Sequence, residues 1–352
     1  MTDLSDVPLV VYLDTNHWYA LGRANAGRRD LPTDRELLER LRMLSREGRI
    51  VVPLSAVHYS ELWENPRDRL TAEATEVMEE LSDFWTLAPL SAVFAEEFDT
   101  QLKARFGRPA VVRVSPKIGR GVGFANGMAG SFRIDASPAA MEALQRRLGQ
   151  DGIRQLEASA NAAFERLTLR GGRDVVGFNP YADRDRAEVR LARVLRVVDN
   201  LRADPSLYRR LDDVVVAGEF VAEMFEDFLG ALVHADDDPY RIATELTASK
   251  EQMTELLLAM PSRRVAVTIR QRYHRDLEHR WTVSDLRDID ALSIATPYCD
   301  VVVTDNAVRT AITHAHLDQL FSTVVISHRE QLTVASQERC KRRRTQVPGW
   351  SG

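Results

Sequence analysis

Short runs of β-branched residues occur near both ends of this chain, and helical patterns separate them. The strand candidates are residues 8–13, 49–54, 86–90, 301–305 and 323–327. The helical candidates are residues 34–46, the stretch from an N-cap at Ser55, the stretch from residue 91 to Phe106, residues 285–298 and the stretch from Asn306. Strands that alternate with helices are typical of parallel βαβ units. We therefore predict an α/β fold in which both ends of the chain contribute strands to one parallel sheet flanked by helices.

The middle of the chain has a different composition. Residues 107–136 are rich in Gly and Pro, which predicts an extended loop or an irregular hairpin. Ser137 can cap a helix with Pro138 at its first position, and apolar spacing near 3.6 residues continues to about His279. We expect a large, mostly helical insertion. The predicted division is residues 1–106 and 281–345 for the α/β domain, with residues 107–280 as the inserted loop and helical domain.

The composition is that of a globular protein, with 44% hydrophobic and 28% charged residues among 352. The N-terminus carries acids where a secretory signal has a basic region, and no apolar stretch is long enough to cross a bilayer. The two cysteines, Cys299 and Cys340, have no metal-type spacing. We expect a cytoplasmic protein without disulfides and without a membrane partner.

The net charge of −5 hides an uneven distribution of basic residues. Between Gln101 and Ile134 there are seven basic residues and no acid, and further basic clusters occupy residues 263–281 and 339–344. Local basic patches on an acidic protein are compatible with a polyanionic substrate, although each patch alone also fits a solvated helix face. From the first patch we select as candidate nucleic-acid contacts Lys103, Arg105, Arg113, Lys117 and Arg120.

Acidic residues follow two of the predicted strands. Asp14 ends the run "VVYLD" and Asp305 ends "VVVTD". Ligands of parallel α/β sheets bind at the carboxyl ends of the strands, so both are site candidates, but Asp is also a preferred helix N-cap. A third acid, Glu61, lies on the helix after the second strand and faces either solvent or the sheet edge. His17 and His58 lie beside these acids and are expected to be structural.

The segment "SDLRDIDALSIA" places three acids at the start of a helix. At about 100° per residue, Asp285 and Asp288 share a face with Ile289, whereas Asp290 points nearly the other way. If the apolar face packs on the sheet, Asp288 or Asp285 faces inward and Asp290 faces water. Pro297, near the end of the same pattern, should break or kink the helix.

In their order, "YLDTN", "SAVHYSEL", an acid-bearing helix and "VVVTDN" resemble the motif series of the PIN-domain superfamily of metal-dependent nucleases, in particular its larger prokaryotic members. The resemblance covers residues 7–100 and 281–335. It implies an acidic quartet of Asp14, Glu61, Asp288 and Asp305. Alignment on "DALSIAT" alone would put Asp290 in place of Asp288, which helix facing favours. The polar neighbours that would support these carboxylates are Thr15, Asn16, Asp285 and Thr304.

Four carboxylates in one pocket repel one another, and they are stable together only with a cation or with bound protons. Hard oxygen ligands select Mg²⁺ or Mn²⁺ over Zn²⁺. Such ions hold a phosphodiester and lower the pKa of a bound water for in-line attack. We expect Asp14 to be the central ligand and Asp305 a second, with Glu61 and Asp288 completing the set or orienting water.

The predicted function is a divalent-metal-dependent endonuclease that binds nucleic acid and cleaves RNA rather than DNA, a preference that rests on the family alone. Roles as a toxin of a toxin–antitoxin pair, in RNA processing or in phage defence all fit this chemistry, and an inhibitory partner protein is compatible with the first. The insertion would cap the sheet edge and select substrate, or it would form a homo-oligomer.

Two other classes compete with this prediction. A catalytically silent PIN-like module would bind nucleic acid or a protein without cleaving anything. Metal-dependent cleavage of labelled RNA, abolished by Asp14→Asn, separates this module from the nuclease. A phosphatase of the haloacid dehalogenase type also places an Asp after its first strand, but it needs a second Asp two residues later, where this chain has Asn16.

Overall fold

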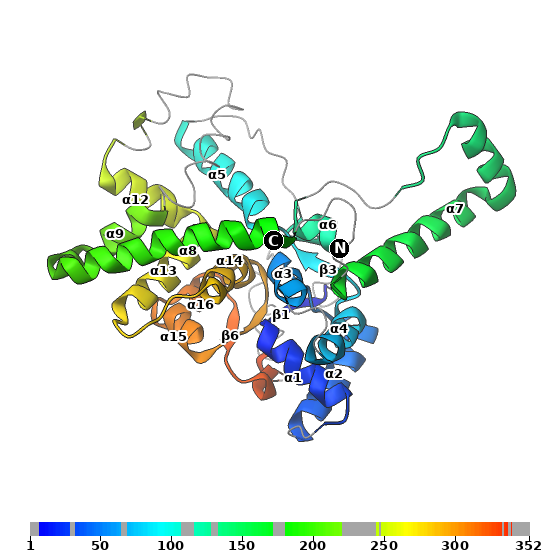
Figure 1. Ribbon diagram of the computed structural model, residues 1–352, viewed down its shortest axis with the longest axis horizontal. Helices are drawn as coiled ribbons and strands as arrows, with labels where there is room; N and C mark the ends of the chain where they lie inside the picture. Colours follow the sequence, from blue (N-terminus) through cyan, green and yellow to red (C-terminus); the bar gives the residue numbers. More distant parts are fainter. Residues whose placement is uncertain are drawn as a thin grey trace, which may run out of the picture.

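The computed structural model describes most of the chain. The described residues are 7–28, 32–64, 69–106, 116–127, 133–171, 180–219, 244–245, 248–332, 334–336 and 339. A sheet of four parallel strands has the order β2–β1–β5–β6, and Figure 1 labels β1 and β6. Its strands are β1 (Leu9–Leu13), β2 (Ile50–Val51), β5 (Val301–Val303) and β6 (Val324–Ile326). The predicted α/β fold, with strands from both ends of the chain in one parallel sheet, is confirmed.

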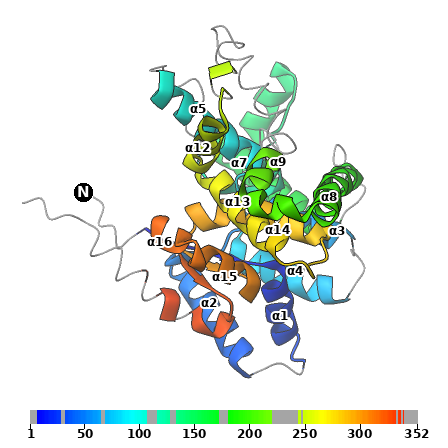
Figure 2. The ribbon, with the colours of Figure 1, turned by 90° about the vertical axis from the view of Figure 1, so that its left-hand side faces the viewer.

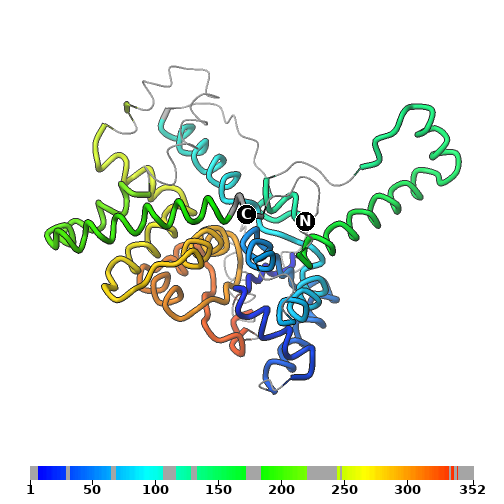
Figure 3. The backbone as a smooth tube through the Cα atoms, in the orientation of Figure 1, coloured from blue at the N-terminus to red at the C-terminus, as the bar shows by residue number. Residues whose placement is uncertain are grey.

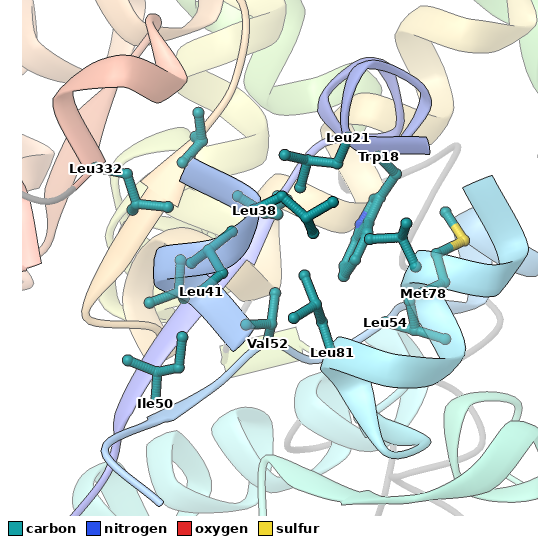
Figure 4. Packing of buried hydrophobic residues seen from close by; sticks show 14 of the residues in the cluster. Trp18, Leu21, Leu38, Leu41, Ile50, Val52, Leu54, Met78, Leu81 and Leu332 are labelled. Atoms are coloured by element: carbon teal, nitrogen blue, oxygen red, sulfur yellow. The ribbon is translucent and has the colours of Figure 1, made fainter. Parts of the chain in front are cut away.

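The alternation of side chains along β1 gives the sheet two buried faces. Leu9, Val11 and Leu13 point to one face and Tyr12 points to the other, because the side-chain period of a strand is two. Figure 4 shows the cluster on the first face, where Trp18 is completely buried. The helices that cover this face are α1 (Thr15–Asn25), α2 (Pro32–Arg46), α3 (Ala56–Glu64) and α4 (Arg69–Ser82).

Helices from later in the chain cover the second face. They are α13 (Pro261–Arg275), α14 (Val283–Tyr298), α15 (Asn306–His314) and α16 (Leu317–Leu320), and a short 3₁₀ helix, η4 (Arg329–Gln331), follows β6. Ile289 and Leu292 of α14 are each 1% exposed, so this helix buries the apolar face that the sequence predicts. Pro297 lies in the last turn of α14, and the expected break coincides with the end of the helix one residue later.

Two further strands form an antiparallel pair beside the main sheet. β3 (Trp85–Leu87) pairs with β4 (Ile118–Arg120), and one parallel bridge connects Thr86 to Leu54, in the stretch after β2. The strand expected over residues 86–90 is therefore shorter and begins one residue earlier. The described part of the segment expected to be a loop or irregular hairpin contains β4 and the short helix α6 (Gly121–Ala125).

The inserted segment is mostly helical over its described residues, as predicted. α7 (Pro138–Leu169) projects away from the rest of the protein, which is clearest in the tube of Figure 3. Ser137 caps α7 by accepting the Ala140 N–H, and Gly149, with a φ of 65°, kinks it. The other elements are α8 (Pro180–Ala203), the 3₁₀ helix η2 (Pro205–Arg210), α9 (Leu211–Gly218) and α12 (Lys250–Ala259).

The insertion packs against the α/β part at several places. Phe94 and Phe98 of α5 (Leu90–Phe106) stack at 5.6 Å and form a hydrophobic cluster with α8, α9 and α12. α8 lies beside α3 and α14 in two views at right angles (Figure 1, Figure 2). A helix of the insertion is therefore held against the two helices that carry Glu61 and Asp288, while the boundaries at residues 106 and 280 stay predictions.

Among the described helices, none has both the length and the apolar character that crossing a bilayer requires.

Candidate functional site

Asp14 and Asp305 follow adjacent parallel strands, β1 and β5. The Asp14 N–H donates to Val303 O at 3.0 Å. Both acids are also helix N-caps: Asp14 Oδ1 accepts the Thr15 N–H at 2.7 Å, and Asp305 Oδ1 accepts two N–H groups of α15 at 2.6 and 2.9 Å. Each cap uses Oδ1 and leaves Oδ2 for a further contact. Capping a helix and serving a ligand are therefore compatible roles for these acids.

A buried histidine fixes the position of Glu61 relative to Asp14. His58 Nε2 donates to Leu13 O at 3.0 Å, and its Nδ1 accepts the Ser55 N–H at 3.0 Å. Burial lowers the pKa of His58 to about 3, so the ring is neutral, and the Ser55 N–H sets its tautomer. Leu13 directly precedes Asp14. Because Glu61 lies one turn after His58 on α3, this structural histidine holds the two acids at a fixed separation.

A capping box at the start of α14 orients Asp288. Thr282 is the N-cap and its hydroxyl accepts the Asp285 N–H, while Asp285 Oδ2 accepts the Thr282 N–H at 2.6 Å, so Asp285 completes the capping box. Asp288, one turn later, interacts with the other predicted acids. Our expectation that Asp290 faces water is wrong. Its carboxylate forms a bidentate ion pair with Arg190 of α8, at 2.6 and 2.8 Å, because α8 packs on that side of α14.

The predicted acids differ in burial: Asp14 is buried, Glu61 and Asp288 are half-buried, and Asp305 is exposed. Burial raises the pKa of Asp14 to about 7, although the hydrogen bond from the Thr15 N–H lowers it. The charges of Glu61 and Asp305 add to the rise. Burial, followed by the charges of the three other acids, raises the pKa of Asp288 to about 9. Burial is also the main cause that raises the pKa of Glu61. The charges of the other predicted acids therefore disfavour the ionised forms of Asp14 and Asp288, whereas the charges that act on Glu61 are those of Arg287 and Glu64.

One cavity of about 450 Å³, which we call the acidic pocket, is lined by three of the four predicted acids. Its acidic residues are Asp14, Glu61, Glu64, Glu188 and Asp288, its arginines are Arg184 and Arg287, and its other residues are Thr15, Asn16, Tyr19, Thr282, Val283 and Ser284. Asp305 is exposed at the end of β5 and lies outside this lining. α8 supplies Arg184 and Glu188, so the insertion completes one wall of the acidic pocket.

The polar neighbours predicted to support the acids differ in what they contact. Thr15 and Asn16 line the acidic pocket, but Thr15 Oγ1 has no hydrogen-bond partner within the described ranges, so the Thr15 side chain does not make the expected bond to a carboxylate. Thr304 is buried, and its Oγ1 has no hydrogen-bond partner among the described residues, so it does not make the expected bond to a carboxylate. His17 is buried too, and burial lowers its pKa to about 4.

Two residues that the sequence interpretation missed interact electrostatically with the predicted acids. Tyr273 of α13 is 6% exposed, and burial, followed by the charges of Asp305 and Asp288, raises the pKa of its phenol. A phenol that stays neutral can donate a hydrogen bond to an anion. The Arg287 side chain is 8% exposed and donates to Glu64 Oε1 at 2.8 Å. The adjacency of Arg287 to Asp288 was a signal in the sequence, whereas Tyr273 reaches the site only through the fold.

The basic residues selected from the acid-free segment do not line the acidic pocket within the described ranges. Three of them form ion pairs, at 2.6, 2.7 and 3.6 Å, namely Lys117 with Glu96, Arg120 with Asp83 and Arg105 with Glu255. Lys103 is exposed on α5, and Arg113 lies outside the described residues. The segment has no acids of its own, but it folds against acids from other parts of the chain, which reduces its positive field.

The donor chemistry of the acids suits a hard divalent cation. All four offer carboxylate oxygens, and Glu61 Oε2 is buried without a hydrogen-bond partner in the described part of the chain. However, no three His, Cys, Asp or Glu side chains of the described residues are arranged so that they could hold one metal ion. Asp14 and Asp305 direct one oxygen each to helix N–H groups instead. The residues fit such a cation in their chemistry, while two of the side chains have the conformations of helix caps.

No protein-family model, no curated protein and no solved structure matches this chain. What is established by the structure is an α/β fold with a four-stranded parallel sheet flanked by helices.

Proposed function

We propose that this protein is a divalent-metal-dependent endonuclease that hydrolyses phosphodiester bonds of nucleic acid, with RNA as the expected substrate. The proposal depends on one observation, that Asp14, Glu61 and Asp288 from three different elements line one cavity, where burial and the charges of neighbouring acids raise the pKa values of Asp14 and Asp288. Such a cluster opposes folding and is typical of sites that serve a ligand. A hard divalent cation is the ligand that a set of carboxylate oxygens favours.

The placement of the acids supports a PIN-like assignment. Asp14 and Asp305 follow adjacent parallel strands, Glu61 comes from the helix after β2, and Asp288 comes from the helix directly before β5. This is the order that the motif resemblance implies.

Each group at the site has a proposed role. Asp14, Glu61 and Asp288 would hold the cation from different walls of the acidic pocket, and Asp305 would join them from β5. When bound, Mg²⁺ or Mn²⁺ would position the phosphodiester and lower the pKa of the attacking water. The neutral phenol of Tyr273 would donate a hydrogen bond to a phosphate oxygen. The preference for RNA, and a role as a toxin, in RNA processing or in defence, come from the resemblance.

The test is cleavage of an end-labelled single-stranded RNA by the purified chain with Mg²⁺ or Mn²⁺, with a DNA strand of the same sequence in parallel. We expect internal cuts that EDTA abolishes and that Asp14→Asn and Asp288→Asn reduce by about 100-fold or more. Asp151→Asn is the matched control, because Asp151 lies on the projecting α7 and its side chain is 86% exposed. Intact RNA with both cations, in a preparation with the circular dichroism of a folded protein, would refute the proposal.

A catalytically silent PIN-like binding module is the second candidate. It is favoured by the capping bonds of Asp14 and Asp305 and by the lack, among the described acids, of a group arranged around one ion. Such a module would bind the RNA strand and leave it intact. Its Asp14→Asn variant would bind the strand as well as the wild type does. Cleavage by the wild type that the Asp14→Asn variant lacks would exclude it.

A further inference from the structure

The charged residues that line a second cavity, near the acidic pocket, are mostly arginines, and we call this cavity the basic pocket. Its volume is about 380 Å³, within the range of about 300–1,000 Å³ that is typical of small-ligand sites. Its charged residues are four arginines and one acid, namely Arg186, Arg190, Arg263, Arg287 and Asp290. The acidic pocket has the reverse balance, with five acids and two arginines.

Shared elements connect the two pockets. Arg287 lines both of them, so it forms part of the wall where they meet. α8 also borders both, with Arg184 and Glu188 at the acidic pocket and Arg186 and Arg190 at the basic pocket. A ligand that follows α8 and passes Arg287 would therefore reach from one pocket to the other.

Buried contacts hold two arginines of the basic pocket in place. Arg190 is fixed by the bidentate pair with Asp290. Arg263 donates to Glu219 at 3.0 Å and lies 5.2 Å above the ring of Phe94. The Arg263 side chain is 4% exposed, and its Nε has no hydrogen-bond partner within the described ranges. A planar guanidinium whose position is fixed by neighbouring groups, at the wall of a cavity, is suited to binding an anion.

The remaining walls of the basic pocket suit a nucleoside. Hydroxyl and amide groups come from Ser60, Ser91 and Asn126. Apolar surface comes from Pro89, Leu90 and Ile294. Apolar side chains can contact the face of a base, and hydroxyl and amide groups can bond to its edge or to the sugar. The pocket thus combines the two surfaces that a nucleotide presents, an anionic phosphate and a partly apolar nucleoside.

We infer that the basic pocket binds a nucleotide adjacent to the scissile phosphate of a single-stranded nucleic acid, with the phosphate on its arginines and the nucleoside on the wall from α3 and α5. The identity of the scissile phosphate rests on the proposed nuclease function, but binding in the basic pocket requires no cation. The inference gives the insertion a role, because α8 sets the path of the strand between the two pockets.

The test measures binding of a short fluorescein-labelled single-stranded RNA by anisotropy in EDTA, so that no cation-dependent cleavage occurs. Arg186 is exposed, and we expect Arg186→Glu to weaken binding roughly tenfold and to reduce the slope of log K against log salt by about one. Its control is Arg196→Glu, because Arg196 is exposed on the same helix and lies outside both linings. The control should change affinity by less than about threefold.

A neutral substitution separates filling of the pocket from long-range charge. Ser91 is exposed at the start of α5, and Ser91→Trp should fill the basic pocket and weaken binding roughly tenfold without changing the charge. Thr100→Trp, at an exposed position further along α5, is its control and should leave affinity unchanged.

If both pocket variants bind like their controls, or if the wild type does not bind the RNA, the inference is overturned, whatever the cleavage assay shows. If the pocket variants lose binding while the wild type leaves RNA intact with both cations, the basic pocket is supported as a nucleotide site and the nuclease proposal fails.

Discussion

Replacing Asp288 by Asn should stabilise the protein, although Asp288 lies in the candidate site. Burial and three neighbouring acids raise its pKa from the ordinary 3.8 to about 9. At about 1.4 kcal/mol per pKa unit, this rise sets an upper limit of about 7 kcal/mol on the penalty of ionising Asp288 in the folded state. We expect Asp288→Asn to raise the free energy of unfolding by about 1–3 kcal/mol near pH 8, because water reaches the pocket and the remaining acids then ionise more fully.

The stabilisation by Asp288→Asn should depend on pH with a definite sign. Below the ordinary pKa near 3.8, Asp288 is protonated in the folded and unfolded states, so the variant and the wild type should be equally stable. As the pH rises through the folded-state pKa of about 9, the wild type loses the part of its free energy of unfolding that depends on a protonated Asp288. The difference between the two proteins should therefore grow from acid to alkaline pH.

Asp290→Asn, two residues further along α14, is the matched control. Although burial raises the pKa of Asp290, the charge and hydrogen bonds of Arg190 lower it further, so its ionised form stabilises the fold above the ordinary pKa. Loss of the bidentate pair should lower the free energy of unfolding by about 2 kcal/mol near pH 8. Urea unfolding followed by circular dichroism in EDTA, near pH 5 and near pH 8, measures both variants. If Asp288→Asn destabilises the protein as Asp290→Asn does, Asp288 is an ordinary structural acid and the argument from repulsion is refuted.

Three further predictions concern the same site. Mg²⁺ should raise the Tm of the wild type more near pH 8 than near pH 5, because protons compete for the carboxylates with raised pKa, and equal shifts in scanning fluorimetry would contradict this. His58→Ala should lower the free energy of unfolding by about 2–4 kcal/mol at neutral pH. Since the folded-state pKa of His58 is about 3, the wild type should lose part of this stability as pH falls below about 6.5, and a cost that is independent of pH in urea titrations would disagree. Tyr273→Phe should keep the melting temperature within a few degrees and slow RNA cleavage by about tenfold or more, and unchanged cleavage would remove the phenol from the site.

The strands and the acids that follow them could be predicted because their signals are local. "VVYLD" and "VVVTD" combine β-branched residues with an acid at the strand end, and parallel pairing puts the ends of β1 and β5 at the same edge of the sheet. β4 could not be predicted in this way. It has only three residues, one of them Gly119, and it forms because β3 supplies its partner.

The charged partners were harder to predict, because charge along the sequence does not report the electrostatic field in space. Lys117 and Arg120 stand in an acid-free segment but pair with Glu96 and Asp83 in the fold. The arginines of the basic pocket come from three helices that only tertiary packing brings together, α8, α13 and α14. No spacing rule within one element connects them.

The hydrophobic core explains how the fold can sustain repulsion among the acids. Val11 and Leu13 of β1 are buried in one core cluster and Tyr12 in the other, so Asp14 cannot move away from its neighbours unless β1 leaves both. Burial of each large apolar side chain contributes about 1.5–3 kcal/mol, so the side chains that anchor β1 together outweigh a repulsion of a few kcal/mol. A similar balance holds for α14, where Ile289 and Leu292 fix the helix that carries Asp288. The acids therefore stay together because the cores on both faces of the sheet leave them no alternative position, and a bound cation would relieve the repulsion without any rearrangement of these cores.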